Sequence, residues 1–211
     1  MNFKGIIFDL DGVICSTDEY HYLAWKALAD RLGIPFNRAR NNLLRGVSRM
    51  ASLDIILEKA TVDYTPEEKL AFAEEKNDLY RSMLRQMSPA DLADEVRDAL
   101  QALRARGLRL AIGSSSRNTP MILAQIGLGS FFDAVADGND ITHSKPHPEV
   151  FLKAAAMLNM EPAECLVVED AHAGVEAAVA GGFACAALGD ARDDERAQWR
   201  LHTFADLMTI A

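Results

Sequence analysis

The chain has 211 residues, enough for one large domain or for a core with a smaller second domain. Hydrophobic residues make up 49% and charged residues 25%, the usual balance of a globular protein, which excludes wholesale disorder and collagen-like repeats. The formal net charge of −9 opposes binding to nucleic acid, so we expect no nucleic-acid partner. Local positive groups must therefore hold any phosphate-bearing ligand.

Neither membrane spans nor disulfides are predicted. The apolar run at the amino end is too short for a secretory signal and is interrupted by Asp9 and Asp11. No stretch approaches the roughly 18 apolar residues of a membrane span. The three cysteines are odd in number and far apart, which indicates neither a disulfide framework nor a zinc site. We expect a cytoplasmic protein with no membrane partner, and a monomer.

Short apolar runs rich in β-branched residues predict five strands. They cover residues 3–8, 108–112, 134–136, 165–168 and 183–188. Helical stretches separate these runs, and strands that alternate with helices predict an α/β fold with a parallel sheet.

About a hundred residues separate the first two strands, far more than one crossover helix needs. Thr17 or Asp18 can cap a helix that ends at Arg31, and helix-start signals at Ser48 and Thr65 predict two more. The core resumes with a helix over residues 91–107. We therefore expect a core domain made of residues 1–16 and 88–211, with a helical cap domain, residues 17–87, inserted between them.

Two acidic clusters follow predicted strands. Asp9 and Asp11 stand two apart at a strand end, where alternation sends both side chains toward one face of the loop. Glu169 and Asp170 follow the strand over 165–168. Because two carboxylate clusters at one sheet edge repel each other, a hard cation such as Mg²⁺ is the expected cofactor. Taken singly, each cluster could instead be a turn or a helix start.

Two further loops can hold phosphate oxygens. Residues 113–118 form a small, hydroxyl-rich loop that opens a helix and offers Ser114, backbone N–H groups and Arg117 to an anion. Lys145 lies in a loop that prolines restrict. Alone, the first loop could simply cap a helix, and a single loop lysine is usually solvated.

The ordered set of these motifs resembles the haloacid dehalogenase superfamily of phosphoryl-transfer enzymes. The matching segments are Phe8 to Val13, Ser114, Lys145 and Val168 to Asp170, and the resemblance spans essentially the whole chain. It implies a Rossmann-like, doubly wound parallel sheet as the core, with the helical cap inserted after the first strand.

Within that superfamily the cap resembles that of the β-phosphoglucomutase family. The resemblance implies a set of substrate-binding residues: His21, Trp25, Gly46, Val47, Ser48, Arg49, Ser52, Lys76, Ser116, Arg117 and Asn118. Trp25 could equally be a packing anchor. The resemblance implies that His21, together with Lys76, orients Asp11, whereas the alternative for His21 is an interfacial imidazole. The chain departs from the family at two places. Arg45 stands where the family usually has a lysine, and residues 93–95 lack the Pro-Gly pair that is common there.

The resemblance also implies the chemistry. Asp9 attacks phosphorus, Asp11 acts as general acid and base, and Ser114 and Lys145 balance charge on the transferring oxygens. The implied metal ligands are Asp9, Asp11, Glu169 and Asp170. The expected reaction interconverts β-glucose 1-phosphate and glucose 6-phosphate through an aspartyl-phosphate. A sugar-phosphate phosphatase is the alternative, and a catalytically silent binding protein or a dehalogenase fits the retained carboxylates less well.

Overall fold

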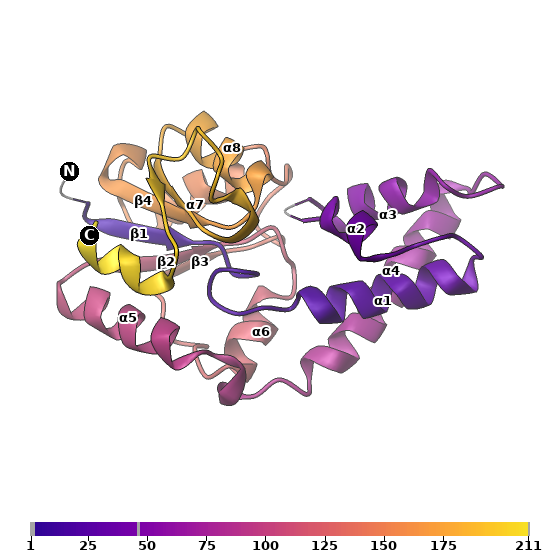
Figure 1. The fold of residues 1–211 in the computed structure, drawn as a ribbon, viewed down its shortest axis with the longest axis horizontal. Coiled ribbons are helices and arrows are strands. Elements are labelled where there is room, and N and C mark those ends of the chain that lie inside the picture. The colour runs from indigo at the N-terminus through magenta and orange to yellow at the C-terminus, as the bar shows by residue number, and fades with distance from the viewer. Residues whose placement is uncertain (1–2, 46, 211) are drawn as a thin grey trace.

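A computed structural model describes residues 3–45 and 47–210 (Figure 1). The strands are β1 (Gly5–Phe8), β2 (Arg109–Gly113), β3 (Ala134–Ala136), β4 (Cys165–Glu169), β5 (Ala184–Ala187) and β6 (Trp199–Arg200). The α-helices are α1 (Asp18–Arg31), α2 (Arg38–Asn42), α3 (Arg49–Leu57), α4 (Pro66–Leu84), α5 (Asp94–Ala105), α6 (Thr119–Gln125), α7 (Glu149–Met157) and α8 (His172–Ala180).

The strands form one parallel sheet in the order β3-β2-β1-β4-β5-β6. The predicted α/β class, the parallel sheet and all five expected strands are therefore confirmed, with ends shifted by one or two residues. The sequence did not predict β6 or α2. Each is too short, at two and five residues, to leave a periodic pattern.

Helices cover both faces of the sheet, as a doubly wound fold requires. Alternation along β1 sends Ile6 and Phe8 into the hydrophobic cluster that contains α5 and α6 residues, and sends Ile7 into the cluster that contains α7 and α8 residues. Figure 1 shows α5 on one side of the strands and α7 and α8 on the other. Cys15, Cys165 and Cys185 are all buried.

Helices α1 to α4 lie beside the sheet domain rather than against a face of the sheet (Figure 1). Their contacts form a third hydrophobic cluster, which includes Trp25, Leu28, Leu53 and Ile56. No helix in the described part of the chain is long and apolar enough to cross a membrane.

The predicted helix starts have different outcomes. Thr65 and Glu68 form a reciprocal capping box at the start of α4, and the Ser48 hydroxyl accepts the Ala51 N–H at 3.2 Å, so both predictions are confirmed. The third helix, α1, starts at Asp18 with Thr17 at its N-cap position and ends at Arg31, as predicted, but the Thr17 hydroxyl makes no capping bond and instead donates to the Asp11 carboxylate.

Candidate active site

The site lies at the carboxyl edge of the sheet, where three central strands end together. Phe8 of β1 is in register with Ile112 of β2 and Val168 of β4. The residues that follow these strands therefore meet in space. This shared edge brings together Asp9, Ser114, Glu169 and Asp170, all of which are buried.

Lys145 occupies the centre of this group. Its ammonium donates to Asp9 Oδ1 and to Glu169 Oε1, each at 2.5 Å, and its side chain is only 1% exposed. The alternative of a solvated loop lysine is therefore wrong. Ser114 is also buried, and its Oγ accepts the Ser116 N–H at 3.2 Å, which orders the loop after β2.

The carboxylates outnumber the buried cation. Oxygens of Asp9, Glu169 and Asp170 lie within 4.8 Å of one another, and burial raises the pKa of both Asp9 and Asp170. Glycine at position 12 keeps this space open, because a Cβ there would lie 2.0 Å from Asp170 Oδ2 and the backbone φ is +85°. Hard oxygen donors with uncompensated negative charge fit a divalent cation such as Mg²⁺.

The four candidate metal-site carboxylates differ in their partners. Glu169 already binds Lys145, and its Oε2 accepts the backbone N–H groups of Asp170 and Ala171 at 2.9 and 3.0 Å. Asp170 Oδ2 lies 3.8 Å from the Arg45 guanidinium. The side chain of Asp11 points elsewhere, toward Thr17.

Asp11 sits in a hydrogen-bonded chain that reaches the cap. Thr17 donates to its carboxylate, and the Tyr80 hydroxyl of α4 lies 2.9 Å from Thr17 Oγ1. Burial raises the pKa of Asp11 to about 6, against the opposing Thr17 hydrogen bond. Sequence reasoning assigned the orientation of Asp11 to His21 and Lys76, but in the structure its direct partner is Thr17.

His21 and Lys76 pair with each other. Lys76 Nζ lies 2.9 Å from His21 Nδ1 and stands over the rings of Trp25 and Tyr80, at 4.7 and 4.5 Å from the centroids. Burial lowers the pKa of both groups, and the Lys76 charge lowers that of His21 further. The same burial thus favours the uncharged form of each group in this hydrogen-bonded pair.

A polar hollow of about 350 Å³ lies between α4 and the loops that follow β2 and β3. Its lining residues are Arg49, Asn77, Arg81, Arg117, Asn118, Pro120, Met121 and Asn139. None of these described residues carries a carboxylate, so three arginines share the space without an acidic partner among them. Burial, followed by the nearby Arg117 charge, lowers the pKa of Arg49. Such a cluster of like charges fits a multiply charged anion.

One hydrogen bond in this hollow joins the cap helices to the sheet domain. Asn118 donates from Nδ2 to Asn77 Oδ1 at 2.9 Å, while the Arg117 guanidinium donates from Nε to the Gly138 carbonyl at 3.2 Å. Sequence reasoning missed Arg81 and Asn139. Only their placement on the surface of this hollow distinguishes them from other polar residues.

The remaining predicted binding residues are more scattered. Trp25 is 2% exposed and belongs to the hydrophobic cluster of α1 to α4, as the packing alternative predicts. Ser52 is buried in α3, and Val47 and Ser48 are half-buried just before that helix. Ser116 is half-buried, and its Oγ accepts the Asn118 N–H at 3.2 Å. Gly46 lies outside the described residues.

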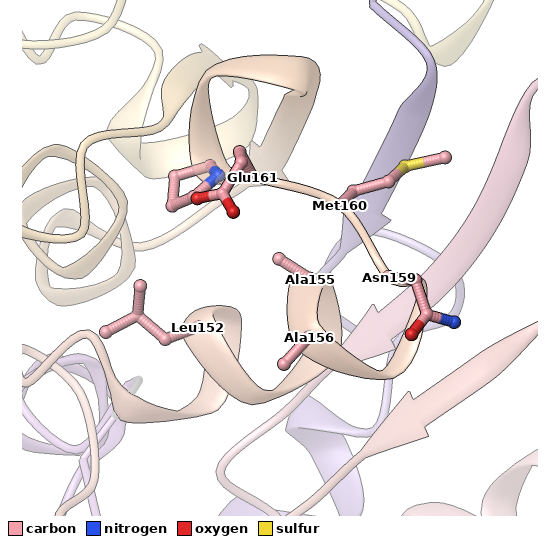
Figure 2. A pocket seen from close by; sticks show the side chains of 7 residues that line it. Leu152, Ala155, Ala156, Asn159, Met160 and Glu161 are labelled. Atoms are coloured by element: carbon pink, nitrogen blue, oxygen red, sulfur yellow. The ribbon is translucent and has the colours of Figure 1, made fainter.

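A second hollow, of about 320 Å³, lies at the opposite edge of the sheet (Figure 2). Leu152, Ala155 and Ala156 of α7 line it together with the segment from Asn159 to Pro162. Met160 from this lining approaches the amino end of β1 at Gly5. Its lining brings no group of titratable side chains together, so it adds nothing to the catalytic site.

Comparison with known proteins agrees with this geometry. The model of the haloacid dehalogenase-like hydrolase family matches residues 3–182, so the chain belongs to that family. Like other members with this set of motifs, it is a phosphoryl-transfer enzyme.

Among similar proteins, a β-phosphoglucomutase from Bacillus subtilis is 40% identical over 188 residues, which cover 88% of this chain and 83% of that protein. The fructose-1-phosphate phosphatase YqaB from Escherichia coli is 33% identical over 86% of this chain and 94% of its own length. A crystal structure of β-phosphoglucomutase from Clostridium difficile superposes with a TM-score of 0.91 at 35% identity, and covers 97% of this chain and 93% of its own.

Proposed function

We propose that this enzyme is a β-phosphoglucomutase, which interconverts β-glucose 1-phosphate and glucose 6-phosphate through β-glucose 1,6-bisphosphate. The observation that carries the proposal is the three-arginine hollow, which is separate from the carboxylate site. A monophosphatase needs one phosphate site, whereas a mutase must also hold the phosphate that does not react. Similarity to mutases at 40% and 35% identity agrees with this preference over the phosphatase alternative.

Asp9 is the proposed nucleophile. Its carboxylate oxygen forms a bond to phosphorus while the bond from phosphorus to the leaving sugar oxygen breaks, which leaves an aspartyl-phosphate. Asp11 gives a proton to that sugar oxygen and takes one from the hydroxyl that attacks next. A pKa of about 6 suits both tasks near neutral pH. Lys145 and Ser114, buried beside Asp9, stabilise charge on the transferring oxygens.

The acidic cluster is the proposed Mg²⁺ site. Asp9, Asp170 and the backbone carbonyl of Asp11 would hold the ion, and Glu169 would support it by fixing Lys145 and the backbone after β4. A bound Mg²⁺ would supply positive charge that stabilises the negative charge on the phosphoryl oxygens. In our proposal the Asp11 carboxyl takes no direct part in the metal shell, because it faces Thr17.

The hollow is the proposed binding site for the phosphate that does not react. Arg49, Arg117 and Asn118 reach it from both the cap helices and the sheet domain, and Arg81 adds a third positive charge from α4. The Ser116 hydroxyl accepts the backbone N–H of Asn118 and so helps to position that residue. The bisphosphate must bind in two orientations. This binding site must therefore accept the C1 phosphate in one orientation and the C6 phosphate in the other.

Residues 17–87 act in this proposal as a cap that excludes water. Contacts between the cap and the core include the Asn77 to Asn118 hydrogen bond and the Arg45 ion pair to Asp190 at 2.6 Å. Preferring a sugar hydroxyl over water by a thousandfold takes about 4 kcal/mol of barrier difference. A cytoplasmic location and a monomeric state stay predictions from the sequence.

The test is product analysis with β-glucose 1-phosphate, Mg²⁺ and a catalytic amount of the bisphosphate. Glucose 6-phosphate, followed with a coupled dehydrogenase, should accumulate much faster than free phosphate. Arg49→Ala should reduce isomerisation more than residual hydrolysis, because attack by water does not need the remote phosphate to be oriented. If the wild-type enzyme releases phosphate faster than it forms glucose 6-phosphate, the phosphatase alternative is correct.

A further inference from the structure

A second cluster of metal-ligating side chains lies outside the acidic site. His143, His147 and Glu149 each offer a ligand atom, and these atoms lie within 4.8 Å of one another. His143 and His147 belong to the segment between β3 and α7 that carries Lys145, and Glu149 is the first residue of α7. Both imidazoles are exposed, whereas Lys145 is buried. The phosphoryl-transfer chemistry uses none of the three.

The spacing of these groups suits a small cation. His143 Nδ1 lies 3.1 Å from Glu149 Oε2, and the two imidazole centroids are 4.7 Å apart. Two ligands held at ~2.05 Å from a tetrahedral Zn²⁺ are separated by roughly 3.3 Å, so the first pair already has the required separation. The Glu149 backbone N–H donates to His147 Nδ1 at 3.3 Å, which keeps this ring beside the carboxylate, and an ion bound through Nδ1 would replace this long hydrogen bond.

The carboxylate is fixed before any ion binds. Backbone N–H groups of Thr142 and His143 donate to Glu149 at 3.1 and 2.8 Å, and these bonds lower the pKa of Glu149 to about 2. Lys153 lies 3.4 Å from Oε1, whereas His143 pairs with Oε2. Oε2 therefore remains the oxygen that faces an imidazole.

The loop itself is braced. His147 lies between two prolines, and its N–H donates to the Ser144 carbonyl at 3.1 Å. Because the loop backbone is already ordered, binding of an ion would cost little conformational entropy. Neutral imidazoles with one carboxylate select borderline transition metals, whereas Mg²⁺ prefers oxygen donors alone.

We propose that His143, His147 and Glu149 form a binding site for a divalent transition-metal ion of the Zn²⁺ class, separate from the acidic Mg²⁺ site. The exposed imidazoles leave the remaining coordination position to water. An ion bound there would tie together the two sides of the loop whose middle residue is Lys145. This proposal is independent of the mutase assignment.

Calorimetric titration of the tag-free protein with Zn²⁺, in excess Mg²⁺ to fill the acidic site, tests the proposal. We expect one equivalent to bind with a dissociation constant of about 10 µM or lower, and either His143→Ala or His147→Ala to weaken binding at least about tenfold. His202→Ala, another exposed imidazole, and Asp170→Asn should leave it unchanged. Co²⁺ should give a visible absorption band that the same two variants abolish.

Two outcomes would overturn the proposal. Absence of Zn²⁺ binding up to about 100 µM means that the three groups do not converge on an ion. Binding that survives either His143→Ala or His147→Ala, or that Asp170→Asn removes, means that the ion binds elsewhere.

Discussion

Replacing Lys145 by methionine should destabilise the sheet domain strongly in metal-free protein. The lysine is the only cation that hydrogen-bonds to the described carboxylates of Asp9 and Glu169, at 2.5 Å each. Methionine keeps most of the side-chain volume against the Phe151 ring, whose centroid lies 4.5 Å from Nζ. The substitution therefore removes charge and hydrogen bonds without opening a large cavity.

The expected loss of unfolding free energy is about 3–5 kcal/mol, the usual cost of leaving one side of a buried ion pair without its partner. With an m value of about 2.5 kcal/mol/M in urea, this loss lowers the midpoint by roughly 1–2 M. Added Mg²⁺ should recover more stability in Lys145→Met than in the wild type, because it meets a larger uncompensated negative charge.

Tryptophan fluorescence can follow the sheet domain alone. The chain has two tryptophans, Trp25 in α1 and Trp199 in β6, so a Trp25→Phe background reports on the sheet. Lys153→Met is the matched control on α7, since this lysine is 42% exposed and should cost no more than about 1 kcal/mol. If Lys145→Met unfolds within about 1 kcal/mol of the wild type, the buried lysine does not compensate these carboxylates as argued.

The other predictions concern the metal, the nucleophile and the hollow. Asp9→Asn should abolish phosphoryl transfer with circular dichroism unchanged, and a tenth of the turnover retained would contradict its role. Asp170→Ala should raise the Mg²⁺ concentration needed for half-maximal activity, whereas full activity in excess chelator would refute the metal site. Arg81→Ala should raise KM for the bisphosphate about fivefold, and Arg85→Ala, one helical turn further on, should not; equal effects would exclude a specific contact. Burial raises the pKa of Asp9 from 3.8 to about 7, so the folded state binds protons that the unfolded state releases. The metal-free protein should therefore lose stability as the pH rises across this window, as measured by urea unfolding, and a flat profile would contradict this.

The sequence predicted the residues at strand ends well. Asp9, Ser114 and Glu169 each follow or end an apolar run, and parallel strands place those ends at one edge whatever the details of the helices. The partners of these groups could not be predicted in the same way. Thr17 has the sequence context of a helix cap, but its hydroxyl donates to Asp11 and lies 2.9 Å from the Tyr80 hydroxyl of α4, a long-range contact that the local sequence does not reveal.

The cap was harder to predict than the core. Arg81 and Arg85 are alike as sequence, and only the packing of α4 against the loop that contains Asn118 places one of them in the hollow. The spacing of Trp25 in its helix allows it to face either a sugar or neighbouring side chains. In the structure it packs in the hydrophobic cluster of α1 to α4. Helical periodicity predicts that a face is buried, without saying what covers it.

The buried cysteines make this chain a convenient background for measuring cap motion. Burial raises the pKa of all three thiols, so at neutral pH almost no thiolate is present to react with a maleimide. A cysteine placed at exposed Leu70 on α4 and another at exposed Val179 on α8 would then be the only reactive thiols. Dyes or spin labels at this pair would report the distance between cap and core in a chain whose own cysteines remain in place.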